Sequence, residues 1–197
     1  MTHTHTLTPS EMRYFKAVNV SASKSETRYY LNGVYIDSES GVIAATDGHM
    51  LVTHTDDSYK TMPSCIIPRE LLDKVKINTK SASFVLTFTD TTLTINDTAT
   101  GASFTDKLVD GNFPDYKRVT PSQDDQVKDG ATYTAFSSAL LARFDKIVKA
   151  LGMKNEAVTF NAIASDSPNV GTMAGLDFII MPMRSEYNLP VAIKKEA

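Results

Sequence analysis

The tripeptide Asp47-Gly48-His49 has the residue types closest to a catalytic group in this sequence. An enzyme needs a nucleophile, a base or a metal cluster, and such residues usually lie in a recognisable sequence motif. The sequence has no G-x-S-x-G elbow, no glycine-rich phosphate loop, no H-E-x-x-H motif and no repeated aspartate spacing for Mg²⁺. Turn chemistry explains Asp47-Gly48, and a single histidine after a turn is more often hydrogen-bonded or exposed than a base. We therefore predict that the protein is not an enzyme.

Metal and cofactor sites are also weakly indicated. His3 and His5 alternate with threonine, which is compatible with metal ligands or with the solvated face of a short edge strand, and no third ligand type lies nearby. The single cysteine, Cys65, excludes an internal disulfide and any multi-cysteine metal site, and we expect it to be packed. We expect neither a metal nor a cofactor.

Basic side chains recur in a more regular way, because each of three predicted helices carries lysine or arginine away from its apolar side. These residues are Arg13, Lys16, Arg69, Lys76, Arg143, Lys146 and Lys149. A solvated, charged helix face would explain any one of the three helices. Three such helices in repeated units could instead meet nucleic-acid phosphates from several directions without reading bases.

Composition limits where such a surface could act. The chain has 197 residues, 42% of them hydrophobic, which is enough for one large or two small domains. A net charge of −3 argues against a protein that coats nucleic acid, so only a local basic surface could bind DNA. The sequence has no apolar run long enough to cross a bilayer and no signal-peptide pattern, so we expect a cytoplasmic protein without a membrane partner.

Repeated groups of elements must position these side chains. In the first group, Met1–Leu7 alternates like an edge strand, and Thr8-Pro9-Ser10-Glu11 forms a capping box that begins a helix to about Val20. Tyr29–Ile36 and Val42–Thr53 have strand composition, and a turn at Asp47-Gly48 divides the second of these runs. The predicted order is β, α, β, β, β.

The same order recurs twice. The second group has a strand, a proline-initiated helix and three strands, predicted at Ser64–Ile67, Pro68–Lys76, Phe84–Phe88, Thr92–Asn96 and Ala102–Leu108. The third has elements at Ala131–Phe136, Ser137 or Ser138 to Leu151, Ala157–Ile163, Val170–Ala174 and Phe178–Met181. The apolar face of its helix consists of Leu140, Leu141, Phe144, Ile147, Val148 and Leu151, and Gly152 is its C-terminal cap. We infer three βαβββ units at a spacing of roughly 55 to 65 residues.

The segment Lys107–Pro121, KLVDGNFPDYKRVTP, joins the second and third groups. Its two prolines and Gly111 interrupt regular structure. Its apolar residues favour a joint packed against both neighbours over a free tether, and a strand end followed by a turn is the alternative.

Three blocks in order carry a family resemblance: Arg28–Val52, Lys107–Pro121 and Ile179–Arg184. They resemble the DNA polymerase III beta subunit, the bacterial sliding clamp, over roughly Leu7 to Arg184. The resemblance implies an α+β clamp fold in which repeated βαβββ units place helices around a central hole and sheets outside. It divides the chain into a complete clamp domain at 1–118, a connector at 119–129, a half domain at 130–184 and a tail at 185–197.

The resemblance also implies a hydrophobic pocket for short partner peptides. Its residues would be Leu31, Thr46, Gly48, His49, Leu51, Pro114, Arg118, Val119, Ile179, Met181, Pro182 and Met183. The alternative is that these are ordinary core residues at a domain junction. Met50 stands where the family commonly has arginine, so a polar contact at the rim is expected to be missing. On the DNA side, Arg28 and Tyr29, with Tyr30, would join the basic helix residues at the ring face, although both tyrosines could instead be strand packing.

The function implied is a non-catalytic ring that encircles duplex DNA and binds a DNA polymerase and a clamp loader through short peptide motifs. A clamp-like scaffold for repair, recombination or transcription and a ring without DNA function are the alternatives. The short chain suggests a version from a phage or another mobile element. A family ring contains twelve units, so three units per chain imply a tetramer. A trimer would follow if the acidic loop near Asp124 completes a second domain.

Overall fold

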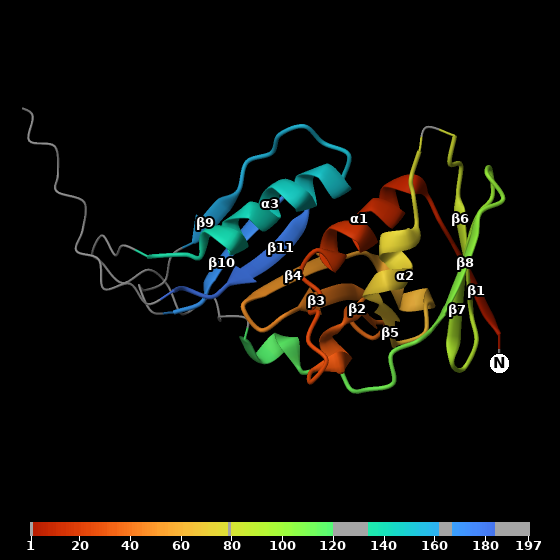
Figure 1. The fold of residues 1–197 in the computed structure, drawn as a ribbon, viewed down its shortest axis with the longest axis horizontal. Coiled ribbons are helices and arrows are strands. Elements are labelled where there is room, and N and C mark those ends of the chain that lie inside the picture. Colours follow the sequence, from red (N-terminus) through yellow and green to blue (C-terminus); the bar gives the residue numbers. More distant parts are fainter. Residues whose placement is uncertain (1, 79, 120–133, 162–166, 184–197) are drawn as a thin grey trace, which may run out of the picture.

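The computed structural model describes residues 2–78, 80–119, 134–161 and 167–183, which form two antiparallel sheets with helices across one face (Figure 1). One sheet has four strands in the order β1-β6-β7-β8, and the other has seven in the order β5-β2-β3-β4-β11-β10-β9. The predicted tail 185–197 and most of the connector lie outside the described residues. Within the described parts of the chain, no helix is both long enough and apolar enough to span a membrane.

The first unit has the predicted order of elements. It comprises β1 (His3–Leu7), α1 (Pro9–Asn19), β2 (Gly33–Asp37), β3 (Val42–Thr46) and β4 (Met50–Thr55), followed by the 3-10 helix η2 (Asp57–Thr61). The capping box is present, because the Glu11 backbone donates to Thr8 Oγ1 (3.2 Å) and the Thr8 backbone donates to Glu11 Oε2 (2.6 Å). The strand predicted from Tyr29 is wrong over its first residues. Tyr29–Leu31 is a 3-10 helix, η1, held by a bond from the Leu31 backbone to the Arg28 carbonyl (2.9 Å).

The second unit exchanges a strand with the first. It comprises β5 (Cys65–Pro68), α2 (Arg69–Lys74), β6 (Phe84–Phe88), β7 (Thr92–Asp97) and β8 (Ser103–Lys107), as predicted. Strand β1 of the first unit pairs with β6 of the second, and β5 of the second pairs with β2 of the first. This reciprocal exchange gives the two units one continuous hydrophobic core.

The third unit extends the sheet of the first. It comprises α3 (Ser138–Ala150), β9 (Thr159–Asn161), β10 (Asn169–Met173) and β11 (Leu176–Ile180), and Gly152 follows α3 with a positive φ of 77°, as the predicted cap requires. The predicted strand Ala131–Phe136 does not appear in its described part, because residues 134–136 are outside any strand. Leu141 was predicted on the buried face but is 41% exposed.

Candidate functional site

An apolar site lies where the third unit joins the first. Strand β11 pairs with β4, which sets Ile179 opposite Leu51 and Phe178 opposite Val52. Leu51, Ile179 and Ala44 form a small buried cluster of their own, packed against Phe113, Tyr116 and Val170. Side chains alternate between the two faces of a strand, so Phe178 and Val52 instead join the large core. The small cluster is thus the floor of a site on the opposite face of the sheet.

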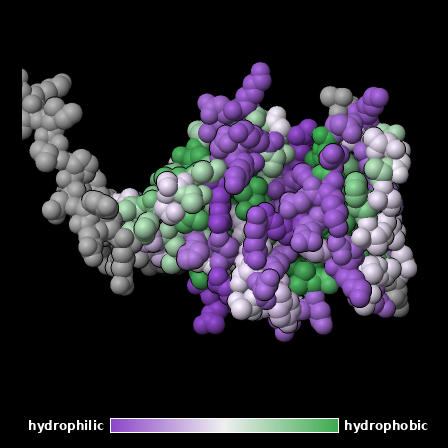
Figure 2. Space-filling model, viewed as in Figure 1, coloured by the Kyte–Doolittle hydropathy of each residue, from purple (hydrophilic) through white to green (hydrophobic). Residues whose placement is uncertain are grey.

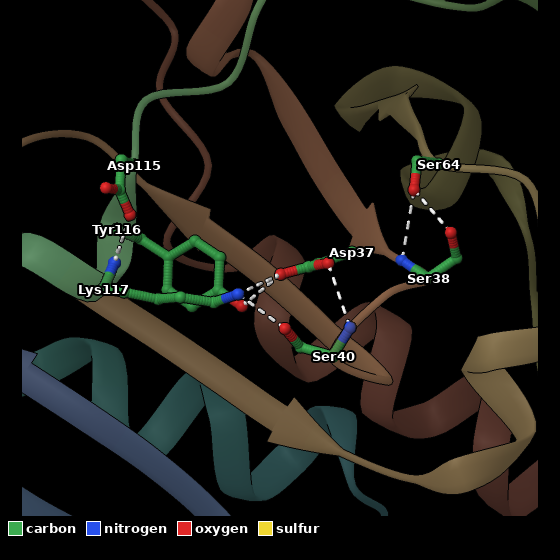
Figure 3. Close-up of polar contacts among 7 residues, drawn as sticks. All are labelled: Asp37, Ser38, Ser40, Ser64, Asp115, Tyr116 and Lys117. Carbon is green, nitrogen blue, oxygen red and sulfur yellow. Dashed lines mark hydrogen bonds and ion pairs between the residues drawn. The ribbon is translucent and has the colours of Figure 1, made fainter.

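The segment after β8 covers this cluster. In this segment, the ring of Phe113 stacks on that of Tyr35 in β2, with ring centroids 5.0 Å apart and an angle of 11° between the ring planes. Near its other end lies the 3-10 helix η3 (Tyr116–Val119). There the Tyr116 hydroxyl donates a hydrogen bond to Asp37 Oδ2 (2.9 Å; Figure 3). The ammonium of Lys117 lies 3.0 Å from the same oxygen. Earlier in the segment, the Val109 backbone bonds to the Ile66 carbonyl in β5 (3.0 Å). Because Phe113 and Tyr116 also pack against the cluster that contains Ile179 of β11, the joint contacts both the second and the third group, as the sequence predicted.

The carboxylate of Asp37 is the anchor of this joint. Burial alone would raise its pKa, but hydrogen bonds from Lys117, Ser40 and Tyr116 outweigh burial and lower the pKa from 3.8 to about 2. Figure 3 shows these three residues converging on Asp37 from the end of β2 and from η3. The charge is thus kept ionised in a nearly buried position, and it fixes Tyr116 and Lys117 against the sheet.

The resulting pocket has a volume of about 190 Å³ and mainly apolar walls. Nine of the twelve residues predicted for it line one cavity: Leu31, Thr46, Gly48, His49, Leu51, Pro114, Val119, Ile179 and Met181. The structure does not place Arg118, Pro182 or Met183 in the lining. It also places Met50, which the sequence analysis set at the rim, in the lining, and it adds two residues that sequence reasoning missed, Asp115 and Tyr116. Tyr116 could have been found from its position two residues after Pro114, because both belong to the same short segment.

The turn between β3 and β4 forms one wall of the pocket. Asp47 Oδ1 accepts hydrogen bonds from the backbones of His49 (2.9 Å) and Met50 (3.1 Å), and Gly48 has a φ of 92° that favours glycine. The other oxygen of Asp47 accepts from Arg143 Nη2 of α3 at 2.6 Å. Burial would raise the pKa of Asp47, but these bonds, led by that of Arg143, lower it. Asp47 and Gly48 therefore shape a turn, as predicted.

A basic hollow lies on the other side of this turn. It has a volume of about 500 Å³, and His49 lines both the hollow and the pocket. Basic residues from the three helices and from the loop after α1 line it: Lys16, Lys24, Arg28, Arg69, Arg143 and Lys146. Figure 2 shows hydrophilic side chains gathered over the middle of the helix-bearing face. Five of the predicted DNA-facing residues thus meet in one place, and Lys24 was missed.

Three of these cations have bonds within the protein. Lys16 donates to the carbonyls of Leu72 (2.8 Å) and Val75 (2.6 Å) at the end of α2, and burial lowers its pKa. Arg69 pairs with Asp73 (3.3 Å), and Arg143 pairs with Asp47. Among the described residues, Lys24, Arg28 and Lys146 form no ion pair. These last three are the cations best able to meet an anionic ligand.

The other predicted DNA-facing residues lie outside the hollow. Arg13 lies against the C-terminal end of α3, where a Cβ added to Gly152 would collide with its guanidinium. Lys149 pairs with Asp145 on the same helix (2.7 Å), and Lys76 is exposed. Tyr29 is 54% exposed and packs edge to face with Tyr30. The position of a basic residue on its helix therefore did not show whether it lines the hollow. The tertiary structure shows which of them do.

The residues considered for metal binding are not gathered. In the described ranges, no three His, Cys, Asp or Glu side chains lie close enough to hold a metal ion. His5 Nδ1 instead lies 3.2 Å from Thr61 Oγ1. Cys65 is half-buried, and its burial raises the pKa of the thiol to about 12.

Comparison with solved structures identifies the fold. A DNA polymerase sliding clamp from Bacillus subtilis superposes with a TM-score of 0.72 at 17% identity, over 93% of this chain and 64% of that one. A sliding clamp from Bartonella birtlesii bound to griselimycin gives a TM-score of 0.70 at 20% identity, over 92% and 66%. The α+β arrangement predicted from the sequence is therefore confirmed as the sliding-clamp fold.

Sequence comparison identifies the family. The profile described as DNA polymerase III beta subunit, central domain, matches residues 7–115, more than half of the chain. The chain belongs to the DNA polymerase III beta subunit family. The beta sliding clamp of Haemophilus influenzae is 31% identical over 126 residues, which are 60% of this chain and 33% of the relative. That of Caulobacter vibrioides is 28% identical over 157 residues, 75% of this chain and 41% of the relative. The chain thus spans about a third to two-fifths of these relatives.

The Asp37 anchor predicts a pH-dependent stability. Its folded-state pKa lies below 3.8, so the stabilisation by the carboxylate is fully present above that pH and is lost as the pH falls through about 2. The shift corresponds to about 2 kcal/mol. Asp37→Asn should lower the free energy of unfolding at neutral pH by about that amount and flatten its acid dependence, measured by urea denaturation over a pH series. Asp57→Asn is the control, since Asp57 is 90% exposed and its one ion pair among the described residues is with Lys60. Equal acid profiles for wild type and Asp37→Asn would contradict the anchor.

Proposed function

We propose that this protein is a DNA sliding clamp: it assembles into a ring around duplex DNA and tethers a DNA polymerase without catalysing a reaction. The observation that carries the proposal is the pair of sites on either side of the β3–β4 turn. An apolar pocket suits short peptides, and a basic hollow built by three helices suits phosphates. Membership of the beta subunit family supports both assignments.

The ring must be built from several copies. We propose that residues 1–118 form a complete clamp domain of two units, that 119–129 connect it to a half domain at 130–184, and that 185–197 form a tail. Twelve units in a ring and three units in a chain then require four copies, and a trimer is the rival. With the helices inside and the sheets outside, Lys24, Arg28 and Lys146 would face the DNA. Contacts to phosphates alone leave such a ring free to slide.

The proposed function is tested by polymerase processivity on primed circular DNA. The protein, with a cognate polymerase and clamp loader, should lengthen the products made in a single binding event. Linear primed DNA with free ends is the control, because a ring slides off it. If the products are unchanged although the protein binds DNA and clamp-binding peptides, the clamp-like scaffold for repair, recombination or transcription becomes the better assignment.

The pocket predicts binding of peptides that carry a glutamine and a leucine or phenylalanine in the clamp-binding arrangement, with affinity in the micromolar range. Met181→Asp should weaken this binding at least about tenfold, because it sets an unpaired charge against apolar walls. Met153→Asp is a matched control, since Met181 is 39% exposed and Met153 is 38% exposed but lies outside the pocket lining. Fluorescence polarisation with a labelled peptide measures both. Unchanged binding by a folded Met181→Asp protein would remove the pocket assignment.

The hollow predicts a salt-dependent affinity for duplex DNA. Lys146→Glu should weaken binding at low salt several-fold and reduce the slope of log K against log salt by about 0.9 for each phosphate that the protein no longer neutralises. Lys149→Glu is the matched control on the same helix, because Lys149 lies outside the hollow and already pairs with Asp145. Anisotropy titrations of labelled duplex over a salt series measure this slope. Equal effects of the two substitutions would show that general surface charge, and not the hollow, binds DNA.

A further inference from the structure

The first two units show how a clamp domain is closed. Each unit sends the strand that precedes its helix into the sheet of the other: β1 pairs with β6, and β5 pairs with β2. As a result, the strand that follows each helix, β6 or β2, has a neighbour on both sides. Leu7 and Ile67, which directly precede the N-caps of α1 and α2, are both 0% exposed. Reciprocal exchange therefore gives β2 and β6 a neighbour on both sides. It also buries the residue that connects each exchanged strand to its helix.

In the part of the chain that the structure describes, the third unit lacks this completion. Strand β9 follows α3 as β2 follows α1, but β9 pairs only with β10 and is the edge of the seven-stranded sheet in the described part of the chain. The segment before α3, described from Thr134 to Phe136, lies in no strand. In Figure 1 it leads away from α3 on the side where β9 is the edge. Among the described residues, the unit thus has an unpaired sheet edge. The segment before α3 adds no strand to the sheet, and its Ala135 carbonyl accepts a hydrogen bond from the Met183 backbone (2.7 Å).

The exposure of one equivalent side chain in the three helices also sets the third unit apart. The fourth residue after the N-cap is Met12 in α1, Leu72 in α2 and Leu141 in α3, counted from Thr8, Pro68 and Ser137. Met12 and Leu72 are 0% exposed, whereas Leu141 is 41% exposed. The position is therefore buried in the two units that exchange strands, and it is exposed in the third unit as described.

The strand after the helix repeats this pattern. The core residues of β2 and β6 are at most 2% exposed: Val34, Ile36, Phe84, Leu86 and Phe88. In β9, Phe160 packs against Phe144 and Phe178 on the core side but remains 37% exposed. Phe136 stacks on it at 5.6 Å between centroids. An aromatic cluster is thus left at the open edge of the sheet.

We propose that a second copy of this chain completes the third unit by the same reciprocal exchange. Two copies related by a two-fold axis would each place residues 134–136 beside β9 of the other. Leu141 and Phe160 of both copies would then be buried in a shared core. A two-fold contact is self-complementary, so one incomplete surface suffices for both partners. Pairing would also cover the edge of β9, which otherwise invites non-specific strand addition. The inference deepens the self-association within the proposed function, but it depends on the fold and not on DNA binding.

The test measures association and strand protection on the full-length chain. Leu141→Asp should weaken association at least tenfold in sedimentation velocity, with species at even multiples of 21.6 kDa giving way to species of half the mass. Ala139→Asp is the matched control, because the second position after the N-cap is exposed in all three helices, as Ser10, Glu70 and Ala139. In hydrogen exchange, the amides of β9 should be protected in wild type and in Ala139→Asp, and should lose that protection in Leu141→Asp.

Each other outcome overturns the proposal in a defined way. Wild type that is monomeric with β9 protected would mean that another part of the same chain covers the edge. Association unaffected by Leu141→Asp would place the self-contact elsewhere. Association that depends on Leu141 while β9 remains unprotected would show face packing without strand exchange. Failure of the processivity test with an intact, Leu141-dependent dimer would remove the clamp function and leave this inference standing.

Discussion

The antiparallel pairing of β4 with β11 is the contact on which the arrangement of the molecule depends. It joins strands more than a hundred residues apart and makes the sheets of the first and third units continuous. On one face it merges Phe178 and Val52 into the large core, and on the other it sets Ile179 beside Leu51. Because strand residues alternate between faces, one set of backbone bonds both fixes α3 beside α1 and creates the floor of the pocket.

The pocket wall depends on a second, electrostatic constraint. A carboxylate as enclosed as Asp37 is costly unless it is paired and hydrogen-bonded. Lys117, Tyr116 and the Ser40 backbone meet that need, and two of them come from the segment after β8. Satisfying Asp37 therefore requires this segment to lie across the sheet, which carries Pro114 and Val119 to the pocket. Apolar packing of Phe113 and Tyr116 acts in the same direction.

The turn at Asp47 connects the two sites physically. One of its oxygens shapes the pocket-side turn through the His49 and Met50 backbones, and the other pairs with Arg143 in the basic hollow. Much of the positive charge that the sequence places on the helices serves similar internal contacts. Lys16 satisfies carbonyls at the end of α2, and Arg13 lies against the end of α3. The surface left to meet phosphates is therefore narrower than a count of basic residues suggests.

Local chemistry in the sequence determined most of the elements and the family, because caps, turns and alternation act between near neighbours. The Thr8–Glu11 capping box, the break at Asp47-Gly48 and the strands of the second unit all follow from such short-range patterns. Nine pocket residues could be named from the family resemblance. The tertiary structure alone decided that Lys16 and Arg13 serve other helices and that Leu141 is exposed. Each of these depends on which distant segment lies opposite, and helical periodicity marks Leu141 as apolar without showing whether a partner unit is present to bury it.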